Sequence, residues 1–175
     1  MVPTNRHRTL LVELREAGQG HGLRLVGDRA VDSLRLEKGY GIWSAEFRQD
    51  YTPGMSGLDR FVAFDKGDFI GREGALRERA EGPKQRLVLL EVDAGDADAV
   101  KDDGIWIGER MVGFVTSGAY GHHVDKSLAL AYVDADVAES RPEFIVVVVG
   151  EPLSARILPE VPYDPKGARL RDATA

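Results

Sequence analysis

The spacing of apolar residues changes once along this chain, near Gly82-Pro83. Before that point, apolar residues recur at intervals of three and four, which predicts helices over residues 4–17, 28–38 and 72–81. Between these helices, two short apolar runs predict strands over residues 23–26 and 61–64. After Pro83, short apolar runs bounded by turn residues predict five or six strands, over residues 85–92, 104–107, 110–117, 128–133, 144–149 and 153–157.

This change in pattern predicts an α+β fold with two domains, residues 1–82 and residues 83–175. The second domain is predicted to be a small antiparallel β-barrel or sandwich, because its strands are short and its turns frequent. The first is predicted to be a partial α/β domain. Its two short strands make a marginal sheet, so either its helices pack on the barrel or sequence that is not here completes the sheet.

Composition narrows the possible functions. Hydrophobic residues make up 43% of the chain and charged residues 30%, which is typical of a globular protein. The net charge of −6 argues against nucleic-acid binding, and the absence of cysteine excludes disulfides and thiolate metal sites. The longest apolar run, residues 144–149, is too short to span a bilayer. The N-terminus lacks a secretory pattern, so we predict a cytoplasmic protein with neither a nucleic-acid nor a membrane partner.

Several motifs, in order along the chain, resemble one family. They are AVDSLRLEKGY at residues 30–40, TP at 52–53, DKGDFIGR at 65–72, VGFVTSG at 112–118 and ALAYV at 129–133. Together they resemble the C-terminal portion of the glycine cleavage T-protein (aminomethyltransferase) family. The sequences RLEKGY at 35–40 and PYDP at 162–165 are most similar to its dimethylglycine and sarcosine dehydrogenase branch.

The resemblance implies a tetrahydrofolate site, with residues 1–82 forming the C-terminal part of a folate-binding domain. The family transfers a one-carbon unit to tetrahydrofolate from an aminomethyl group or, in the dehydrogenases, from a methylated amine oxidised on a separate FAD domain. The family's catalytic aspartate lies in the N-terminal half and has no counterpart here. The resemblance therefore implies a chain that needs a missing N-terminal half or partner domain for turnover, and it assigns no catalytic residue.

Glu37 is the first candidate for binding folate. A pterin ring presents two parallel N–H donors, and a carboxylate can accept both in charge-assisted hydrogen bonds. Glu37 is also predicted in the last helical turn, where the helix dipole disfavours an anion. The alternative is a solvated glutamate, or one paired with Arg35 or Lys38.

Two further candidates rest on the resemblance. Lys66 aligns with a folate-contacting arginine, although a lysine offers a point charge and no bidentate fork; its alternative is a surface pair with Asp65 or Asp68. Tyr163 lies where the T-protein supplies a tyrosine to the ligand, and its alternative is a packing role between domains.

The sequence departs from the family at two places, and one histidine pair has no assigned role. Met55 stands where the family often has a glutamate, and Glu46 lies near a position where it favours an aspartate. His122-His123 is predicted to be an exposed loop and not a metal site, because no further ligands accompany it.

A second hypothesis remains: a non-catalytic structural or interaction lobe of a larger oxidoreductase. The two hypotheses are distinguished by whether Glu37 and Lys66 face one pocket.

Overall fold

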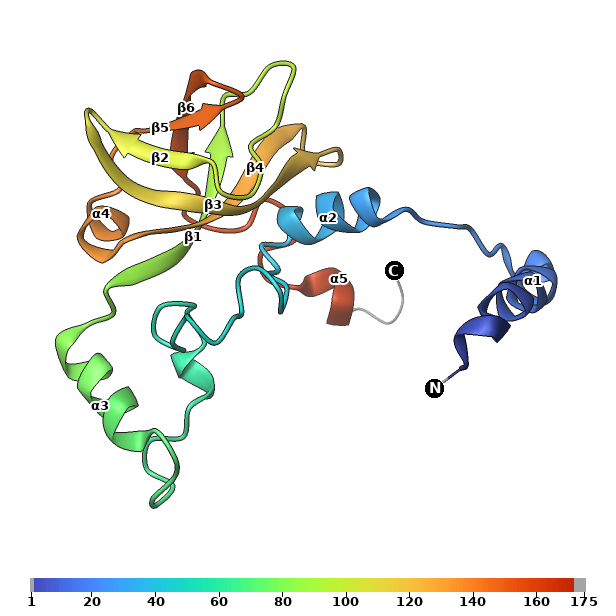
Figure 1. The fold of residues 1–175 in the computed structure, drawn as a ribbon, viewed down its shortest axis with the longest axis horizontal. Helices are drawn as coiled ribbons and strands as arrows, with labels where there is room; N and C mark the ends of the chain where they lie inside the picture. The colour runs from blue at the N-terminus through green and yellow to red at the C-terminus, as the bar shows by residue number, and fades with distance from the viewer. Residues whose placement is uncertain (1, 172–175) are drawn as a thin grey trace.

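The computed structural model describes residues 2–171, and six strands of its second half form a closed antiparallel barrel (Figure 1). The strands are β1 (Gln85–Val92), β2 (Gly104–Ile107), β3 (Arg110–Gly121), β4 (Lys126–Asp134), β5 (Phe144–Val148) and β6 (Glu151–Ile157). Their order around the barrel is β1-β4-β3-β2-β5-β6, and β6 pairs back with β1. The α+β class and the predicted barrel are confirmed, and the strands end within a few residues of the predicted limits.

The barrel interior is filled by residues that alternate along the strands. These inward-facing residues include Leu90, Val92, Ile105, Val115, Ala129, Ala131, Val133, Phe144 and Val146. On β4, the residues between them, Leu128 and Leu130, are also buried, in a separate cluster with Leu36. Strand β4 is therefore buried on both faces, because a helix covers its outer side.

That helix is α2 (Asp28–Glu37), which lies across the outside of β3 and β4 (Figure 1). Leu36 is its fully buried anchor against Leu128 and Leu130. The helix ends before Gly39, whose φ of 66° is left-handed and favours glycine. The predicted helix over residues 28–38 is thus confirmed, and it does pack on the barrel.

The rest of the N-terminal half is far less enclosed. Helix α1 (His7–Gly18) follows a 3₁₀ turn (Thr4–Arg6) and stands away from the barrel at the end of an extended segment (Figure 1). Helix α3 (Arg72–Glu81) matches its predicted bounds and lies on the other side. Both helix predictions are confirmed, but α1 leaves Leu10, Leu11 and Leu14 exposed.

The two strands predicted in this half are wrong. Residues 23–26 are extended but belong to no strand. Phe61 ends a 3₁₀ turn (Asp59–Phe61), and residues 62–64 continue as irregular chain. Leu23, Leu25 and Phe61 are exposed. A strand requires a neighbour to accept its backbone hydrogen bonds, and within the described residues neither run has one.

Two short helices were not predicted. Helix α4 (Ala135–Ser140) connects β4 to β5, and α5 (Ala168–Arg171) comes after β6 in the chain (Figure 1). Within residues 2–171, no helix combines the length and apolar character needed to cross a membrane.

Candidate functional site

A cavity of about 430 Å³ opens where the C-terminal end of α2 meets the β3–β4 hairpin and the segment after β6. Its lining residues are Val31, Leu34, Arg35, Glu37, Lys38, Tyr40, His123 and Tyr163. Most of this wall is apolar or aromatic, and Glu37 supplies a carboxylate. Binding sites for small organic molecules usually combine an apolar wall with a few fixed polar groups in this way.

Glu37 is almost fully buried, yet its carboxylate is only half engaged by the protein. The backbone N–H of His123 donates to Glu37 Oε1 over 2.8 Å. No donor to Oε2 occurs among the described residues, and Glu37 lines the cavity. The alternative of an ion pair with Arg35 or Lys38 is not realised, because Arg35 pairs with Asp32 and Lys38 with Asp164.

A glycine allows Glu37 to lie where it does. A Cβ on Gly121, at the end of β3, would come within 2.9 Å of Glu37 Cγ and of Val124 Cγ2. Such a contact is shorter than packed carbon atoms tolerate. The hairpin therefore supplies both the space for the Glu37 side chain and the N–H that orients its carboxylate.

Tyr163 reaches the same cavity from the segment that follows β6. Its backbone N–H donates to the carbonyl of Glu37 over 3.1 Å, and Lys38 Nζ lies 3.1 Å from Asp164 Oδ2. Burial by itself would raise the pKa of Asp164, but hydrogen bonds from Lys38 and the Ala168 N–H outweigh it and lower that pKa. Two candidates, Glu37 and Tyr163, are thus brought together.

Lys66 is not part of this cavity. Its side chain is exposed in the loop before α3, and Nζ lies 4.7 Å from the centre of the Phe69 ring. Within the described residues it forms no ion pair with Asp65 or Asp68, so the alternative of a surface pair does not occur either.

Glu46, one of the two departures from the family, is a fully buried link between the N-terminal half and the barrel. Its Oε1 accepts from Ser117 Oγ on β3 over 2.6 Å, and its Oε2 accepts from the Ile42 N–H over 2.8 Å. Arg35 Nη1 lies 3.8 Å from Oε2. The Glu46 carboxylate therefore connects Arg35, which lines the cavity, to Ser117 in the barrel wall.

A buried tyrosine strengthens this link. Tyr132 on β4 donates its hydroxyl to the carbonyl of Glu46 over 2.9 Å, and its ring stacks on Tyr51 with centres 3.9 Å apart. Burial raises the pKa of Tyr132, and the neighbouring Tyr51 and Glu46 raise it further. The hydroxyl accordingly stays protonated and keeps its donor role.

At Met55, the other departure from the family, a glutamate from α3 holds the turn at Thr52-Pro53. Met55 brings no carboxylate, but Glu78 on α3 accepts hydrogen bonds from the Thr52 hydroxyl and, over 3.3 Å, from the Gly54 N–H. The Thr-Pro turn is therefore fixed by α3.

The two histidines, predicted to be an exposed loop, lie in the exposed β3–β4 turn but point to different places. His123 lines the cavity of Glu37, with its ring centre 4.9 Å from that of Tyr163 in an edge-to-face arrangement. His122 faces a separate cleft with Asp28 and Asp32. Across residues 2–171, no group of three or more metal-ligating side chains is found.

Sequence reasoning missed Gly121 and His123 as contributors to this site. Their roles depend on contact between the hairpin and a helix 86 residues earlier in the chain. A pairing over that distance leaves no periodic signal in one sequence.

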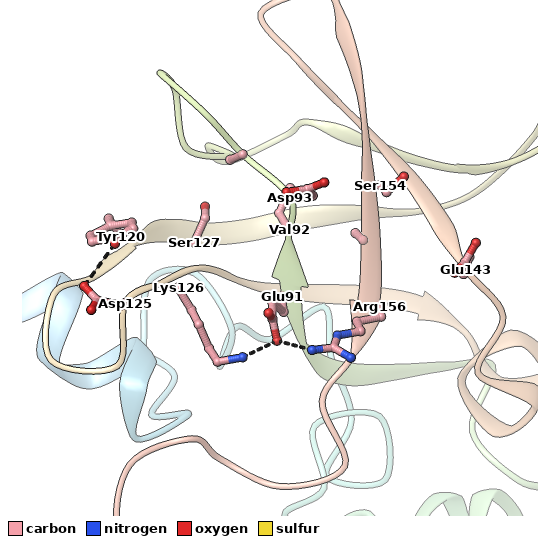
Figure 2. Close-up of a pocket in the computed structure, with 12 residues that line it drawn as sticks. Glu91, Val92, Asp93, Tyr120, Asp125, Lys126, Ser127, Glu143, Ser154 and Arg156 are labelled. Atoms are coloured by element: carbon pink, nitrogen blue, oxygen red, sulfur yellow. Dashed lines mark hydrogen bonds and ion pairs between the residues drawn. The ribbon is translucent and has the colours of Figure 1, made fainter.

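A second hollow of about 430 Å³ lies on the barrel, where the end of β1 meets the start of β4 and the second half of β6 (Figure 2). Its central carboxylate is already paired: Glu91 Oε2 lies 2.6 Å from Lys126 Nζ and 3.0 Å from Arg156 Nη2 (Figure 2). Asp93, Asp125 and Glu143 also line it. More charged side chains line this hollow than line the Glu37 cavity, which is therefore the better candidate for a flat organic ligand.

Family models match both halves of the chain. Residues 1–66 match the model described as "GCVT N-terminal domain", and residues 85–164 match "Glycine cleavage T-protein C-terminal barrel domain". Mouse mitochondrial dimethylglycine dehydrogenase is 37% identical over 93% of this chain, which corresponds to 19% of that protein. An aminomethyltransferase of Caldanaerobacter subterraneus is 32% identical over 90% of this chain and 42% of its own length.

A solved structure shows the same arrangement. The glycine cleavage system aminomethyltransferase T from Bartonella henselae superposes with a TM-score of 0.75 and 26% identity. The match covers 92% of this chain and 44% of the Bartonella chain. The chain thus spans less than half the length of these relatives.

Proposed function

Because this chain belongs to the glycine cleavage T-protein family, we propose that it binds tetrahydrofolate in the cavity of Glu37, as the folate-binding part of an aminomethyltransferase or of a dehydrogenase of methylated amines. The observation that carries the proposal is the half-engaged carboxylate. Glu37 has one oxygen fixed by the His123 N–H, and its other oxygen has no donor among the described residues of the cavity it lines.

The chemistry of the cavity suits a pterin ring. A pterin carries neighbouring N–H donors on one edge, and a carboxylate accepts such donors in strong, directional hydrogen bonds. Val31 and Leu34 offer an apolar wall, and Tyr163 and Tyr40 offer aromatic ones. A flat ring held at one edge by Glu37 would lie against these side chains.

Turnover is proposed to require a partner half. Leu14 on α1 and Leu25 in the extended segment are more than half exposed, as is Leu34 beside the cavity. We propose that these exposed apolar side chains belong to an interface. We assign it to the N-terminal half that the relatives carry, which would also bring the family's catalytic aspartate and the site for the aminomethyl or methylated-amine donor.

One observation favours the second candidate function, a non-catalytic lobe of a larger oxidoreductase. Lys66, which the resemblance assigns to folate, lies outside the Glu37 cavity. A lobe that has lost folate would keep the barrel and its interface but would not bind the ligand.

Titration calorimetry with 5-formyltetrahydrofolate separates the two candidates. The chain is titrated alone and together with the N-terminal half of a bacterial aminomethyltransferase. We expect binding that Glu37→Gln weakens by roughly tenfold or more, about 1.4 kcal/mol. Glutamine keeps the shape of Glu37 but replaces one acceptor with a donor, which opposes the donors of the pterin edge.

Glu81→Gln is the matched control, because Glu81 is also the last residue of a ten-residue helix but is exposed and lines no cavity of this kind. It should bind as the unaltered chain does. Absence of binding both with and without the N-terminal half would reject the folate proposal and favour the structural lobe. Lys66→Ala, measured alongside, tests that residue separately.

A further inference from the structure

The β3–β4 hairpin is fastened to α2 next to the Glu37 cavity. Ser33 Oγ donates to the carbonyl of Tyr120 over 2.7 Å and accepts from the His122 N–H over 3.3 Å. The His123 N–H donates to Glu37 Oε1 over 2.8 Å. Three hydrogen bonds therefore hold the turn in one position against the helix, and the side chain of His123 is placed at the cavity before any ligand arrives.

The imidazole of His123 remains available to a ligand. The residue is exposed, lines the cavity, and contacts Tyr163 with ring planes at 86°. No hydrogen bond from either imidazole nitrogen to another described residue is present. A neutral imidazole offers one donor and one acceptor beside an aromatic face, so it can both pack against a flat ring and hydrogen-bond to its polar edge.

We infer that His123 contacts the same ring that Glu37 holds and so determines which ring systems the cavity accepts. The backbone of His123 touches the carboxylate that anchors the ring, which places its side chain beside the ring and away from any tail. This inference rests on the proposed folate function. It assigns a role to a histidine whose position in an exposed turn predicted none.

His123→Ala is a clean test, because alanine keeps the backbone N–H that orients Glu37 and removes only the imidazole. With 5-formyltetrahydrofolate, again in the presence of the N-terminal half, we expect affinity to fall about tenfold, or about 1.4 kcal/mol. His123→Phe keeps an aromatic face toward Tyr163 without the ring nitrogens, and it should lose roughly threefold, about 0.7 kcal/mol. Both variants should retain the melting temperature of the unaltered chain.

The adjacent histidine provides the control. His122 belongs to the same turn and is also exposed, but its ring contacts Tyr120 and faces the cleft of Asp28 and Asp32. His122→Ala should change affinity by less than about twofold, well under 1.4 kcal/mol. An equal loss in both variants would mean that the turn, and not the His123 ring, is responsible, and would overturn the inference.

A ligand without a tail shows which part of the folate His123 contacts. A tetrahydropterin that lacks the aminobenzoyl-glutamate tail should lose affinity for His123→Ala by the same factor as the whole folate. A loss confined to the folate would place His123 on the tail and overturn the inference.

Tyr163→Ala excludes an indirect effect through the ring that His123 contacts. If His123 only positioned Tyr163, adding His123→Ala to Tyr163→Ala would cause no further loss. We expect a further loss. Binding that is unchanged by His123→Ala rejects this inference alone. Absence of binding by the unaltered chain, both with and without the N-terminal half of the aminomethyltransferase, rejects the folate proposal and this inference together.

Discussion

The barrel and the N-terminal half contain similar apolar residues but use them differently. In the barrel, Phe144 and Ile105 are almost fully buried. In the N-terminal half, Leu25 is 67% exposed and Trp43 is 76% exposed. The barrel has every neighbouring strand within the chain, whereas residues 23–26 have none among the described residues. An apolar pattern thus specifies a local conformation only where the chain also provides its partners.

Truncating one apolar residue in each half should show the largest difference between the two regions. Phe144→Ala removes a buried ring from the barrel core and should lower the free energy of unfolding by about 4 kcal/mol. Leu25→Ala removes an exposed side chain and should change it by less than about 0.5 kcal/mol. Urea denaturation of both variants, followed by circular dichroism, measures the difference.

The same pair tests the proposed interface when the N-terminal half of a relative is present. Leu25→Ala should then weaken the association of this chain with the fragment from the relative, although it leaves the stability of the isolated chain unaffected. A large loss of stability for Leu25→Ala in the isolated chain would contradict the structure, because it would mean that this side chain is already packed.

The sequence predicts the barrel better than the N-terminal half, because the barrel strands have their partners within the chain. The bounds of β1 and β2 were predicted correctly, since short apolar runs bounded by turn residues are local signals. The strands predicted over residues 23–26 and 61–64 were wrong, because strand formation depends on backbone partners that periodicity does not reveal. The burial of β4 on both faces was not foreseen, since it depends on the docking of α2.

The candidate site divides in a similar way. Glu37 was singled out because a motif and an unfavourable helix position coincided there, and the structure places it in a cavity with Tyr163. Lys66 rested on alignment alone, and it lies elsewhere. His123 and Gly121 contribute through a contact between distant segments, and Glu46 through a hydrogen bond to β3. The folate roles of Glu37, Lys66 and Tyr163 stay predictions.

Removing Glu46, which links the N-terminal half of this chain to the barrel, should have the next largest effect on stability. Glu46→Ala leaves the Ser117 hydroxyl and the Ile42 N–H without their buried acceptor and takes a charge partner from Arg35. We expect the free energy of unfolding to fall by about 3 kcal/mol. If the N-terminal half were independent of the barrel, the urea transition of the barrel would not move.

Glu46→Gln separates the hydrogen bonds from the charge. Glutamine keeps an acceptor for Ser117 or Ile42 but does not attract Arg35, so its cost should lie below that of Glu46→Ala. An equal cost for both variants would show that the negative charge, not the hydrogen bonds, makes the link. Folate affinity measured on the same samples reports whether Arg35 moves at the cavity.

The smallest expected effect concerns the barrel alone and depends on pH. Burial by itself would raise the pKa of Glu91, but hydrogen bonds from Lys126 and Arg156, together with their charges, outweigh it and lower that pKa. A carboxyl whose pKa is lower in the folded state stabilises the fold above its unfolded pKa of about 4.3, and loses that contribution as pH falls through the folded pKa. Glu91→Gln should therefore cost stability at neutral pH and cost nothing in acid.

The size of this effect is limited by solvent. The side chains of Lys126 and Arg156 are 31% and 66% exposed, so the difference between Glu91→Gln and the unaltered chain should stay below about 1 kcal/mol at pH 7. It should shrink further in high salt. Asp164, whose pKa is also lowered, titrates in both proteins and cancels in the difference. Urea transitions measured from pH 7 down to pH 3 would show the two stabilities converging; a constant difference would mean that Glu91 acts by packing and not by its charge.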